Sequence, residues 1–255
     1  MRLALLSDVH GNPIALEAVL ADVEAQGGVD GYWVLGDLAA IGYDPAGAVE
    51  RLAALPNARF VRGNTDRSLV EGEPGPSLGH LRNDPSSAAR QIDLAVIFAW
   101  THGHLTARGR LPWLAALPLE QRLTLPDGTR LLGVHASPGR DTGDGIRPVH
   151  TDDDLRAILA GCDAELVVVG HTHWPLDRTV DGVRVVNLGS VSNPLAPDLR
   201  AKYALLEASG AGYEIQARYV DYDLAATIQA IDQSGHPAGD FIKAYFLGQR
   251  RPPWE

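Results

Sequence analysis

Short apolar runs alternate with longer amphipathic segments along the first part of the chain. Residues 2–7 form a predicted buried strand, and apolar side chains then recur at helical spacing over residues 14–23. The next predicted strands cover residues 32–35 and 59–62. Between them, residues 46–55 predict a helix that ends before a proline. This alternation of strand and helix is typical of an α/β protein with parallel strands.

The pattern changes in the second half of the chain. Residues 87–117 have a helical pattern broken at two glycines, which predicts two helices and which we interpret as a cap-like insertion beside the site. From residue 118 onward, turn residues separate short strands, as in hairpins. The predicted strands include residues 131–135, 166–170, 183–188, 203–207 and 213–220, and the last helices cover 225–231 and 241–247. Two packed mixed β-sheets flanked by helices accommodate both halves in a single domain of residues 1–255. Residues 71–87, rich in Gly, Pro and Ser, are predicted to form a mobile loop.

Composition and charge limit the classes of function. Hydrophobic residues make up 45% and charged residues 21% of the 255 residues, which is typical of a folded globular protein. The formal net charge of -10 disfavours binding to nucleic acid or to an anionic membrane, since both require a basic surface. The single cysteine, Cys162, excludes an intramolecular disulfide. No signal peptide or membrane span is predicted, so we expect a cytoplasmic location.

Polar residues with metal-ligand chemistry follow several predicted strands. Asp8 and His10 stand two residues apart after the first strand, and in extended chain their side chains would point the same way. Taken alone, a helix-capping Asp beside a surface His explains them better. Asp37 follows Gly36 at the end of the second strand and suits a metal ligand or a helix cap equally well.

Three further fragments add to this set. Asn64 and Asp66 follow the third strand, although both are also ordinary turn formers. His135 ends an apolar run, where a lone His is more often structural. His171 and His173 follow a very apolar strand and give the strongest local signal for a dinuclear centre. All five fragments lie at predicted strand ends, where α/β sheets place their ligand sites.

Together these fragments resemble the calcineurin-like metallophosphoesterase superfamily. The motifs that carry the resemblance, in the order of the family, are Asp8-Val9-His10, Gly36-Asp37, Gly63-Asn64-Thr65-Asp66, Val134-His135 and Gly170-His171-Thr172-His173. Asn12 and the string Asn187 to Ser190 are similar to the small bacterial phosphodiesterase-like branch. The resemblance implies a four-layer αββα sandwich that hydrolyses phosphoesters, with phosphodiesters preferred, by in-line attack of a metal-bound hydroxide.

The resemblance also implies a ligand assignment. Asp8, His10 and His173 would hold one metal ion, Asn64, His135 and His171 the other, and Asp37 would bridge them. Asp37, Asn64, Asp66 and His135 are the implied catalytic residues. Nitrogen and oxygen ligands without thiolate suit Mn, which we favour, but also Fe, Zn, Ni and Co.

One position departs from the family pattern. Thr65 stands where many members have a His that protonates the departing oxygen, and Asp66 normally orients that His. Other histidines that could replace it are His80, His102 and His104, although each is more often a surface residue. Arg140 could pair with phosphate or be an exposed loop charge, and the 187–190 turn could contact substrate or only connect strands.

Two other classes of function remain open. A non-catalytic binding or scaffold protein can retain this fold, although all seven ligands are present here. A nuclease would use the same chemistry but needs a basic groove, which the net charge disfavours. We expect a small phosphoester as the partner molecule, and a homodimer is possible.

Overall fold

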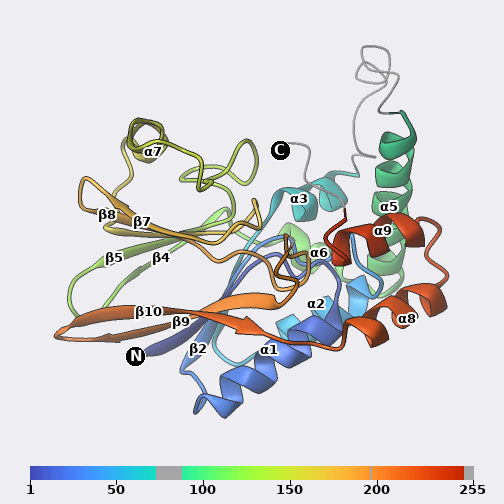
Figure 1. The fold of residues 1–255 in the computed structure, drawn as a ribbon, viewed down its shortest axis with the longest axis horizontal. Helices are drawn as coiled ribbons and strands as arrows, with labels where there is room; N and C mark the ends of the chain where they lie inside the picture. Colours follow the sequence, from blue (N-terminus) through green and yellow to red (C-terminus); the bar gives the residue numbers. More distant parts are fainter. Residues whose placement is uncertain (73–87, 196, 250–255) are drawn as a thin grey trace.

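Two mixed β-sheets form the centre of the protein (Figure 1). The computed structural model describes residues 1–72, 88–195 and 197–249. The first sheet has the order β10 (Gly212–Val220), β9 (Ala201–Ser209), β1 (Arg2–Leu6), β2 (Gly31–Leu35), β3 (Ala58–Val61). The second has the order β4 (Glu120–Thr124), β5 (Arg130–Val134), β6 (Leu166–Val169), β8 (Val183–Asn187), β7 (Leu176–Val180). The strands β1, β2 and β3 are parallel, as are β5, β6 and β8, so each set ends at one edge of its sheet.

Helices cover the outer faces of both sheets. Their bounds are α1 (Pro13–Ala25), α2 (Pro45–Ala53), α3 (Asn64–Glu71), α5 (Ala88–Ala107), α6 (Leu111–Ala115), α7 (Asp152–Leu159), α8 (Leu224–Ser234) and α9 (Gly239–Phe246). Apolar residues of α1 and α2 pack with β1 and β2, and those of α7 pack with β5 and β6. Figure 1 shows α1 beneath the first sheet and α7 above the second. The predicted αββα sandwich is confirmed.

Each central strand contributes to two cores. Leu3 and Leu5 of β1 face Trp33 and the second sheet, whereas Ala4 and Leu6 face the helices. Side chains alternate across a strand, so a strand covered on both faces must be apolar at every position. This explains why the strands near the site appear in the sequence as continuous apolar runs.

Two helices were missing from the sequence interpretation. Helix α3 begins at Asn64, which we took for a turn former together with Asp66. Asp66 instead sits at the third helical position and accepts the backbone N–H of Gly63 at 2.9 Å. Helix α7 begins after Thr151, which exchanges hydrogen bonds with Asp154 as a capping box. Both helices have only eight residues, so their apolar periodicity is weak.

The two helices predicted within residues 87–117 are present as α5 and α6. The predicted break at Gly109 is confirmed, whereas the predicted break at Gly103 is wrong, because Gly103 lies within α5. Most of the predicted 71–87 loop lies outside the described residues. Helices α5, α8 and α9 pack together through Ile97, Ile231 and Phe241. None of the described helices combines the length and the apolarity needed to cross a bilayer.

His236, in the turn between α8 and α9, should make stability depend on pH. Burial and the nearby His104 lower the pKa of His236 to about 4, from 6.5 in the unfolded chain. Below pH 6.5 the unfolded chain binds a proton that the folded protein does not, so stability falls as the pH drops towards 4. We expect this residue to contribute about 1 to 2 kcal/mol of the stability lost between pH 7 and pH 5.

The matched variant is His236→Asn. The ring Nδ1 of His236 accepts the backbone N–H of Ala238 at 3.0 Å, and the amide oxygen of Asn can accept the same bond without titrating. Urea unfolding at pH 7 and pH 5 should show a smaller loss of free energy for the variant than for the wild type. Equal losses in both proteins would contradict the assignment.

Candidate metal centre

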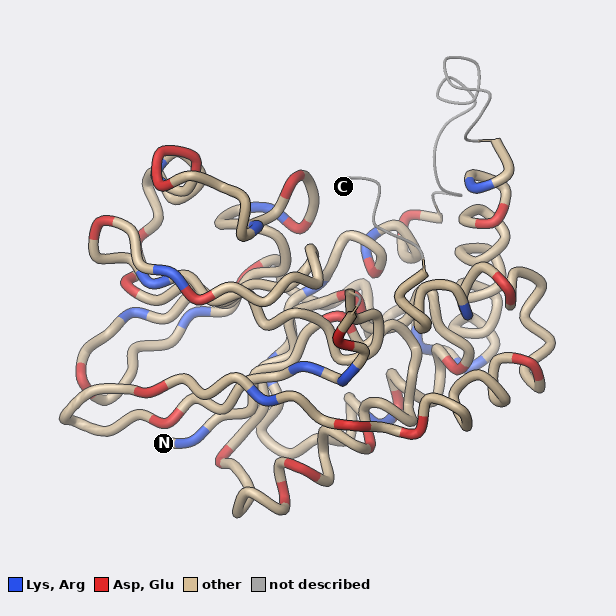
Figure 2. Tube along the Cα trace, viewed as in Figure 1, with Lys and Arg blue, Asp and Glu red and all other residues tan. Residues whose placement is uncertain are grey.

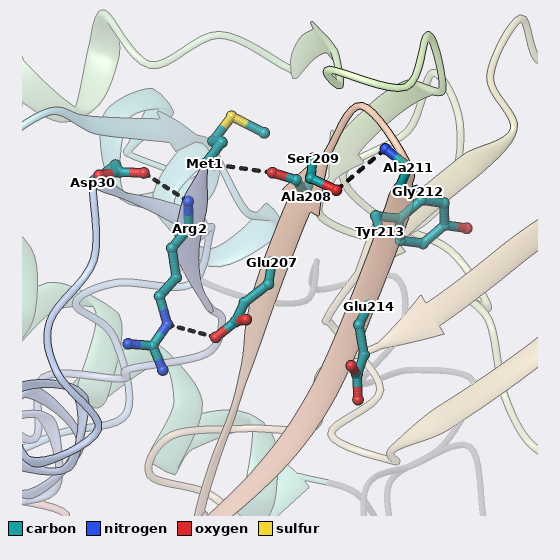
Figure 3. Close-up of a pocket in the computed structure, with 10 residues that line it drawn as sticks. All are labelled: Met1, Arg2, Asp30, Glu207, Ala208, Ser209, Ala211, Gly212, Tyr213 and Glu214. Atoms are coloured by element: carbon teal, nitrogen blue, oxygen red, sulfur yellow. Dashed lines mark hydrogen bonds and ion pairs between the residues drawn. The ribbon is translucent and has the colours of Figure 1, made fainter.

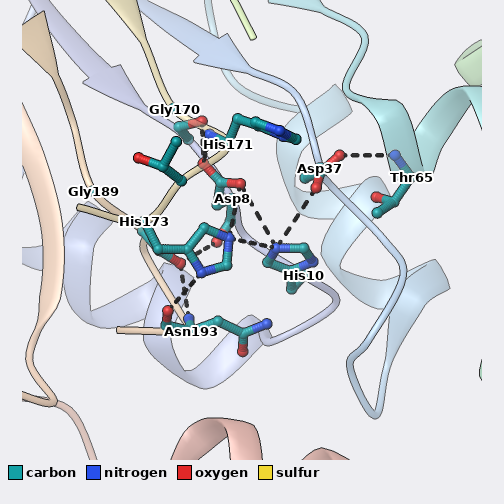
Figure 4. Close-up of polar contacts among 12 residues, drawn as sticks. Asp8, His10, Asp37, Thr65, Gly170, His171, His173, Gly189 and Asn193 are labelled. Atoms are coloured by element: carbon teal, nitrogen blue, oxygen red, sulfur yellow. Dashed lines mark hydrogen bonds and ion pairs between the residues drawn. The ribbon is translucent and has the colours of Figure 1, made fainter. Parts of the chain in front are cut away.

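The ends of five parallel strands bring the candidate ligands together. Asp8 and His10 follow β1, Asp37 follows β2, and Asn64 follows β3. From the second sheet, His135 follows β5, and His171 and His173 follow β6. Six of the seven side chains are buried, and Asn64 is half-buried. The sequence placed all of these residues at strand ends, and the structure gathers them in one cluster. Figure 4 shows Asp8, His10, Asp37, His171 and His173 of this cluster.

The backbone around the cluster departs from extended geometry. Five of the candidate ligands have left-handed conformations, with φ values of 58° for Asp8, 46° for His10, 54° for Asp37, 68° for His171 and 61° for His173. Our expectation that Asp8 and His10 converge because the chain is extended is therefore wrong: they converge through a tight turn. Non-glycine residues adopt positive φ only where the surroundings enforce it, at about 1 to 3 kcal/mol each, and such strain concentrates at functional sites.

One half of the cluster contains Asp8, His10 and His173. Nε2 of His173 lies 3.1 Å from Oδ1 of Asp8, and Nε2 of His10 lies 3.7 Å from the same oxygen. The two Nε2 atoms are 3.2 Å apart. The three ligand atoms lie within 4.8 Å of one another, a spacing that one cation can span.

The other half contains Asn64, His135 and His171. Oδ1 of Asn64 lies 3.2 Å from Nε2 of His135 and 2.9 Å from Nδ1 of His171. The two imidazole nitrogens are 3.3 Å apart. Asp8, Asp37 and His135 also present ligand atoms within 4.8 Å of one another, so Asp8 lies near both halves.

Asp37 lies between the halves. Its Oδ2 is 3.8 Å from Nε2 of His10, and its Oδ1 is 3.4 Å from Nε2 of His135. The backbone N–H of Thr65 donates to Oδ1 at 3.0 Å and fixes the carboxylate in this position. The two oxygens of one side chain thus face different halves, as a bridging ligand requires.

Backbone carbonyls orient all four imidazoles. Nδ1 of His10 lies 2.8 Å from the Ala40 carbonyl, and Nδ1 of His135 lies 2.6 Å from that of Leu35. Nδ1 of His173 and Nε2 of His171 face the carbonyls of Asn193 and Gly143 at 2.7 Å and 2.8 Å. A carbonyl only accepts, so each of these nitrogens carries a proton. The opposite nitrogen of each ring points into the cluster, where its lone pair can bind a metal ion once that nitrogen is unprotonated, as in metal-binding histidines.

The chemistry of the donors fits a cation. Oδ1 of Asp8 is buried and has no hydrogen-bond donor, although two imidazole nitrogens lie beside it. Lone pairs of nitrogen and oxygen that converge without protons between them repel one another, and a divalent ion removes this repulsion. The described residues therefore fit the metal ions that the sequence predicted.

Electrostatics at the cluster also favour positive charge. Burial disfavours the ionised forms of Asp8 and Asp37, but the neighbouring histidines hold the pKa of each carboxyl well below its usual range. Burial lowers the pKa of His135, but Asp37 and Asp8 outweigh it and raise the pKa to about 10. The cluster thus attracts cations, and a metal ion must compete with a proton for His135.

Asp66 supports the centre from behind. Its Oδ2 accepts the backbone N–H groups of Asp37 and Gly63, and its Oδ1 accepts that of Leu38. Burial and the Asp37 carboxylate raise the pKa of Asp66 to about 6. Asp66 holds the Asp37 turn against the start of α3 and does not line the cavity of the site. Asp66 therefore affects the centre by positioning Asp37.

The loop after β8 contains supporting residues that the sequence interpretation only partly found. Nδ2 of Asn187 donates to the Gly170 carbonyl at 2.8 Å and to Oγ1 of Thr172 at 2.9 Å, which fixes the loop of the two histidines. The hydroxyl of Ser190 donates to the Asp8 carbonyl at 2.9 Å. Of the two roles considered for the 187–190 turn, contact with substrate or a structural connection, these hydrogen bonds support the structural one. Asn193, which binds His173, was missed, because a backbone carbonyl leaves no signature in the sequence.

Other proposed contacts lie away from the centre. Arg140 is exposed, and Asp141 pairs with Arg62 at 2.9 Å. His102 binds the Leu69 carbonyl, and His104 is exposed against Trp100. His80 lies outside the described residues. Neither His102 nor His104 lines the cavity, so their ordinary structural interpretation holds.

Two hollows in the surface differ in their chemistry. A cavity of about 200 Å³ is lined by His10, Asp37, Asn64, His171 and His173. A larger hollow of about 540 Å³ lies beside the N-terminus at the end of β9 and β10 (Figure 3). Several of its charged groups have partners: the Arg2 guanidinium pairs with Glu207, the backbone N–H of Arg2 donates to Asp30, and the terminal amine donates to the Ala208 carbonyl. No candidate metal ligand lines the larger hollow, whereas five of them line the smaller cavity.

Comparison with known proteins agrees with this geometry. The family model described as the calcineurin-like phosphoesterase superfamily domain matches residues 1–211. The chain belongs to the calcineurin-like phosphoesterase superfamily. The resemblance found in the sequence motifs is thereby confirmed, and the coarse expectation of a phosphoesterase with a divalent metal site is supported.

Three similar proteins match nearly the whole chain. The crystal structure of a metallophosphoesterase from Sphaerobacter thermophilus is 26% identical with a TM-score of 0.75, and the match covers 98% of this chain and 99% of that one. Hypothetical protein PH1004 from Pyrococcus horikoshii shares the fold, with a TM-score of 0.81 and 23% sequence identity. That match covers 98% of this chain and 99% of PH1004. Protein MJ0912 of Methanocaldococcus jannaschii is 25% identical over 253 residues, 92% of this chain and 93% of that one.

Proposed function

We propose that the protein is a dinuclear metal-dependent phosphodiesterase. The observation that carries this proposal is the set of four imidazoles, each held by a backbone carbonyl. The other nitrogens of His10, His135 and His173 face the carboxylates of Asp8 and Asp37, and that of His171 faces Oδ1 of Asn64. Asp8, His10 and His173 would hold one ion, Asn64, His135 and His171 the second, and Asp37 would bridge them. Manganese is our first choice among the divalent ions that these ligands suit.

The residues of the chain then have defined tasks. Bound divalent ions would supply Lewis acidity and activate water for in-line attack on phosphorus. The carboxylates of Asp8 and Asp37 cancel two of four positive charges, which leaves the site attractive to a phosphate diester. In the overall reaction, water adds to phosphorus, the ester P–O bond breaks, and the departing oxygen takes up a proton. The burial of the ligands excludes bulk water from their lone pairs.

Thr65 occupies the position beside the cavity where a proton donor would act. Its hydroxyl is buried without a hydrogen-bond partner among the described residues. A threonine hydroxyl does not donate a proton to a departing alkoxide at neutral pH, so the departing oxygen must be protonated by water. We therefore expect the enzyme to prefer esters whose alcohols are good leaving groups.

The distribution of charge supports a small substrate. Lys and Arg residues alternate with Asp and Glu along the described chain and do not form a continuous basic track (Figure 2). A nuclease needs such a track to hold the phosphate backbone.

Metal binding and hydrolysis test the proposal together. Calorimetric titration of metal-free protein with Mn²⁺ should give two ions per chain, and hydrolysis of a nitrophenyl phosphodiester should require them. The variants Asn64→Ala and His173→Ala each remove one ligand from a different half, so each should bind one ion fewer or bind it about 10- to 100-fold more weakly. One ion at saturation in the wild type would refute a dinuclear centre, and two ions without hydrolysis of any phosphoester would refute the enzyme.

A further inference from the structure

The cavity at the candidate metal centre has two sides: one is formed by the candidate ligands, and the other by apolar side chains that are not candidate ligands. Beside the ligands, it is lined by Ile41 and by Leu94 and Phe98 of α5, and Tyr245 of α9 completes the wall. All four side chains are half-buried, which leaves part of their surface towards the cavity. Such a combination of polar groups and an apolar wall is typical of a small-molecule site.

Helix geometry makes the wall a single surface. Arg90, Leu94 and Phe98 are four residues apart, so their side chains lie on one stripe of α5, while Ile97 and Leu105 face the core. Figure 1 places α5 and α9 beside each other at the end of the first sheet. Three of the four wall residues thus lie on helices that contribute no candidate metal ligand, and the fourth, Ile41, lies in the loop after β2.

The conformation of Ile41 indicates that the wall has a function. Ile41 has a φ of 65°, in the left-handed region that β-branched residues avoid. Such strain persists only where the surroundings enforce it, and it concentrates at functional sites. Here it directs an apolar side chain to the cavity, next to His10 and Asp37.

Arg90 supplies a positive charge at the same cavity. Of the described residues that line it, Arg90 is the one with a permanently charged cationic side chain, and it pairs with no described carboxylate. Nδ2 of Asn193 and Oγ1 of Thr65 also line the cavity, buried and without hydrogen-bond partners among the residues described. These groups can bind phosphoryl oxygens that the metal ions do not hold.

The size of the cavity limits the apolar group. Its volume is about 200 Å³, whereas an apolar cavity of roughly 150 Å³ holds a benzene molecule. One ring therefore fits beside the metal centre, and a second does not.

We propose that the substrate is a phosphoester with one apolar, phenyl-sized ester group, which lies against Ile41, Leu94, Phe98 and Tyr245 while Arg90 binds a phosphoryl oxygen. This inference rests on the proposed phosphodiesterase function and names its substrate class. Substrates are selected by the burial of their alkyl or aryl group against this wall, and Arg90 orients the phosphoryl group over the metal centre.

The test compares benzylphosphonate with methylphosphonate by calorimetry on the Mn²⁺-loaded protein. Both present the same phosphonate to the metals, so their ratio of affinities measures the apolar wall alone. We expect benzylphosphonate to bind at least about tenfold more tightly, the effect of burying one small ring. Phe98→Ala should lower the ratio and leave methylphosphonate unchanged, whereas Ile92→Ala, at an exposed position of the same helix, should leave the ratio unchanged.

A second pair of variants tests the charge. Arg90→Gln should weaken both phosphonates by about tenfold or more, and Arg108→Gln, an exposed position on the loop after α5, should change neither. Leu94→Ala provides a second test of the wall if Phe98→Ala does not fold.

The outcomes separate the two proposals. Equal binding of the two phosphonates, or a ratio that neither Phe98→Ala nor Leu94→Ala changes, overturns the apolar site. Unchanged binding by Arg90→Gln overturns the role of Arg90. If benzylphosphonate binds as expected but no phosphoester is hydrolysed, the proposed enzyme fails and the binding site stands.

Discussion

Replacement of Asp37 by Asn is expected to reduce metal-dependent phosphodiester hydrolysis by about two orders of magnitude or more. The substitution removes the charge that faces both halves of the centre but keeps an oxygen that can accept the N–H of Thr65. Asn also tolerates the left-handed backbone at this position, where φ is 54°. The fold should therefore survive while the second metal ion is lost or weakened.

The control is Asp240→Asn, which removes the same charge from a side chain that is 99% exposed. Initial rates at saturating Mn²⁺, with the metal content measured in parallel, distinguish the cases. A folded Asp37→Asn protein that had lost a metal ion and kept the wild-type rate would mean that hydrolysis occurs elsewhere.

Replacement of Gly36 by Ala should disturb both stability and metal binding. The added methyl group would lie 2.6 Å from Cα of Gly63 and 2.8 Å from Nδ1 of His135. Backbone and a metal-facing ring must both move, and the φ of 82° is unfavourable for alanine. We expect a loss of about 3 kcal/mol or more in the free energy of unfolding and a large drop in Mn²⁺ affinity.

Gly182→Ala separates the two causes. Gly182 has nearly the same φ, 84°, but its added methyl group would meet no atom within 4 Å. The free energy of unfolding of this variant should therefore fall only by the conformational cost of alanine at positive φ, about 1 to 2 kcal/mol, and the variant should bind metal normally. Denaturant unfolding and metal titration of both variants provide the comparison, and equal losses would show that the close approach to His135 is unimportant.

The sequence predicted the ligands better than it predicted how they are positioned. Six of the seven candidate ligands follow a continuous apolar run, because a strand buried on both faces ends where the polar site begins. Asn64 is the exception, since it follows β3, which contains Arg59 and is only partly buried. That signal is local and survives in the sequence. The left-handed backbone conformations of Asp8 and His171 leave no such signal, since residues other than glycine adopt them and the surrounding loops enforce them.

The supporting contacts were hidden for a related reason. Asn193 and Gly143 bind histidines through their backbone carbonyls, which every residue type possesses. From the sequence, Asp66 was expected to orient a histidine that Thr65 replaces in this chain. In the structure its carboxylate oxygens accept hydrogen bonds from three backbone N–H groups. Arg90 and Phe98 lie on a helix whose approach to the site depends on packing between distant segments, which periodicity does not encode.

The separation of the ligands along the chain has a consequence for the order of folding. His10 and His173 are 163 residues apart, and the two belong to different sheets. Closing such a long loop is slow and precedes any gain from the contact. A nascent chain therefore has no high-affinity site until both sheets have formed and packed, and metal ions enter an almost completed protein rather than guide its assembly.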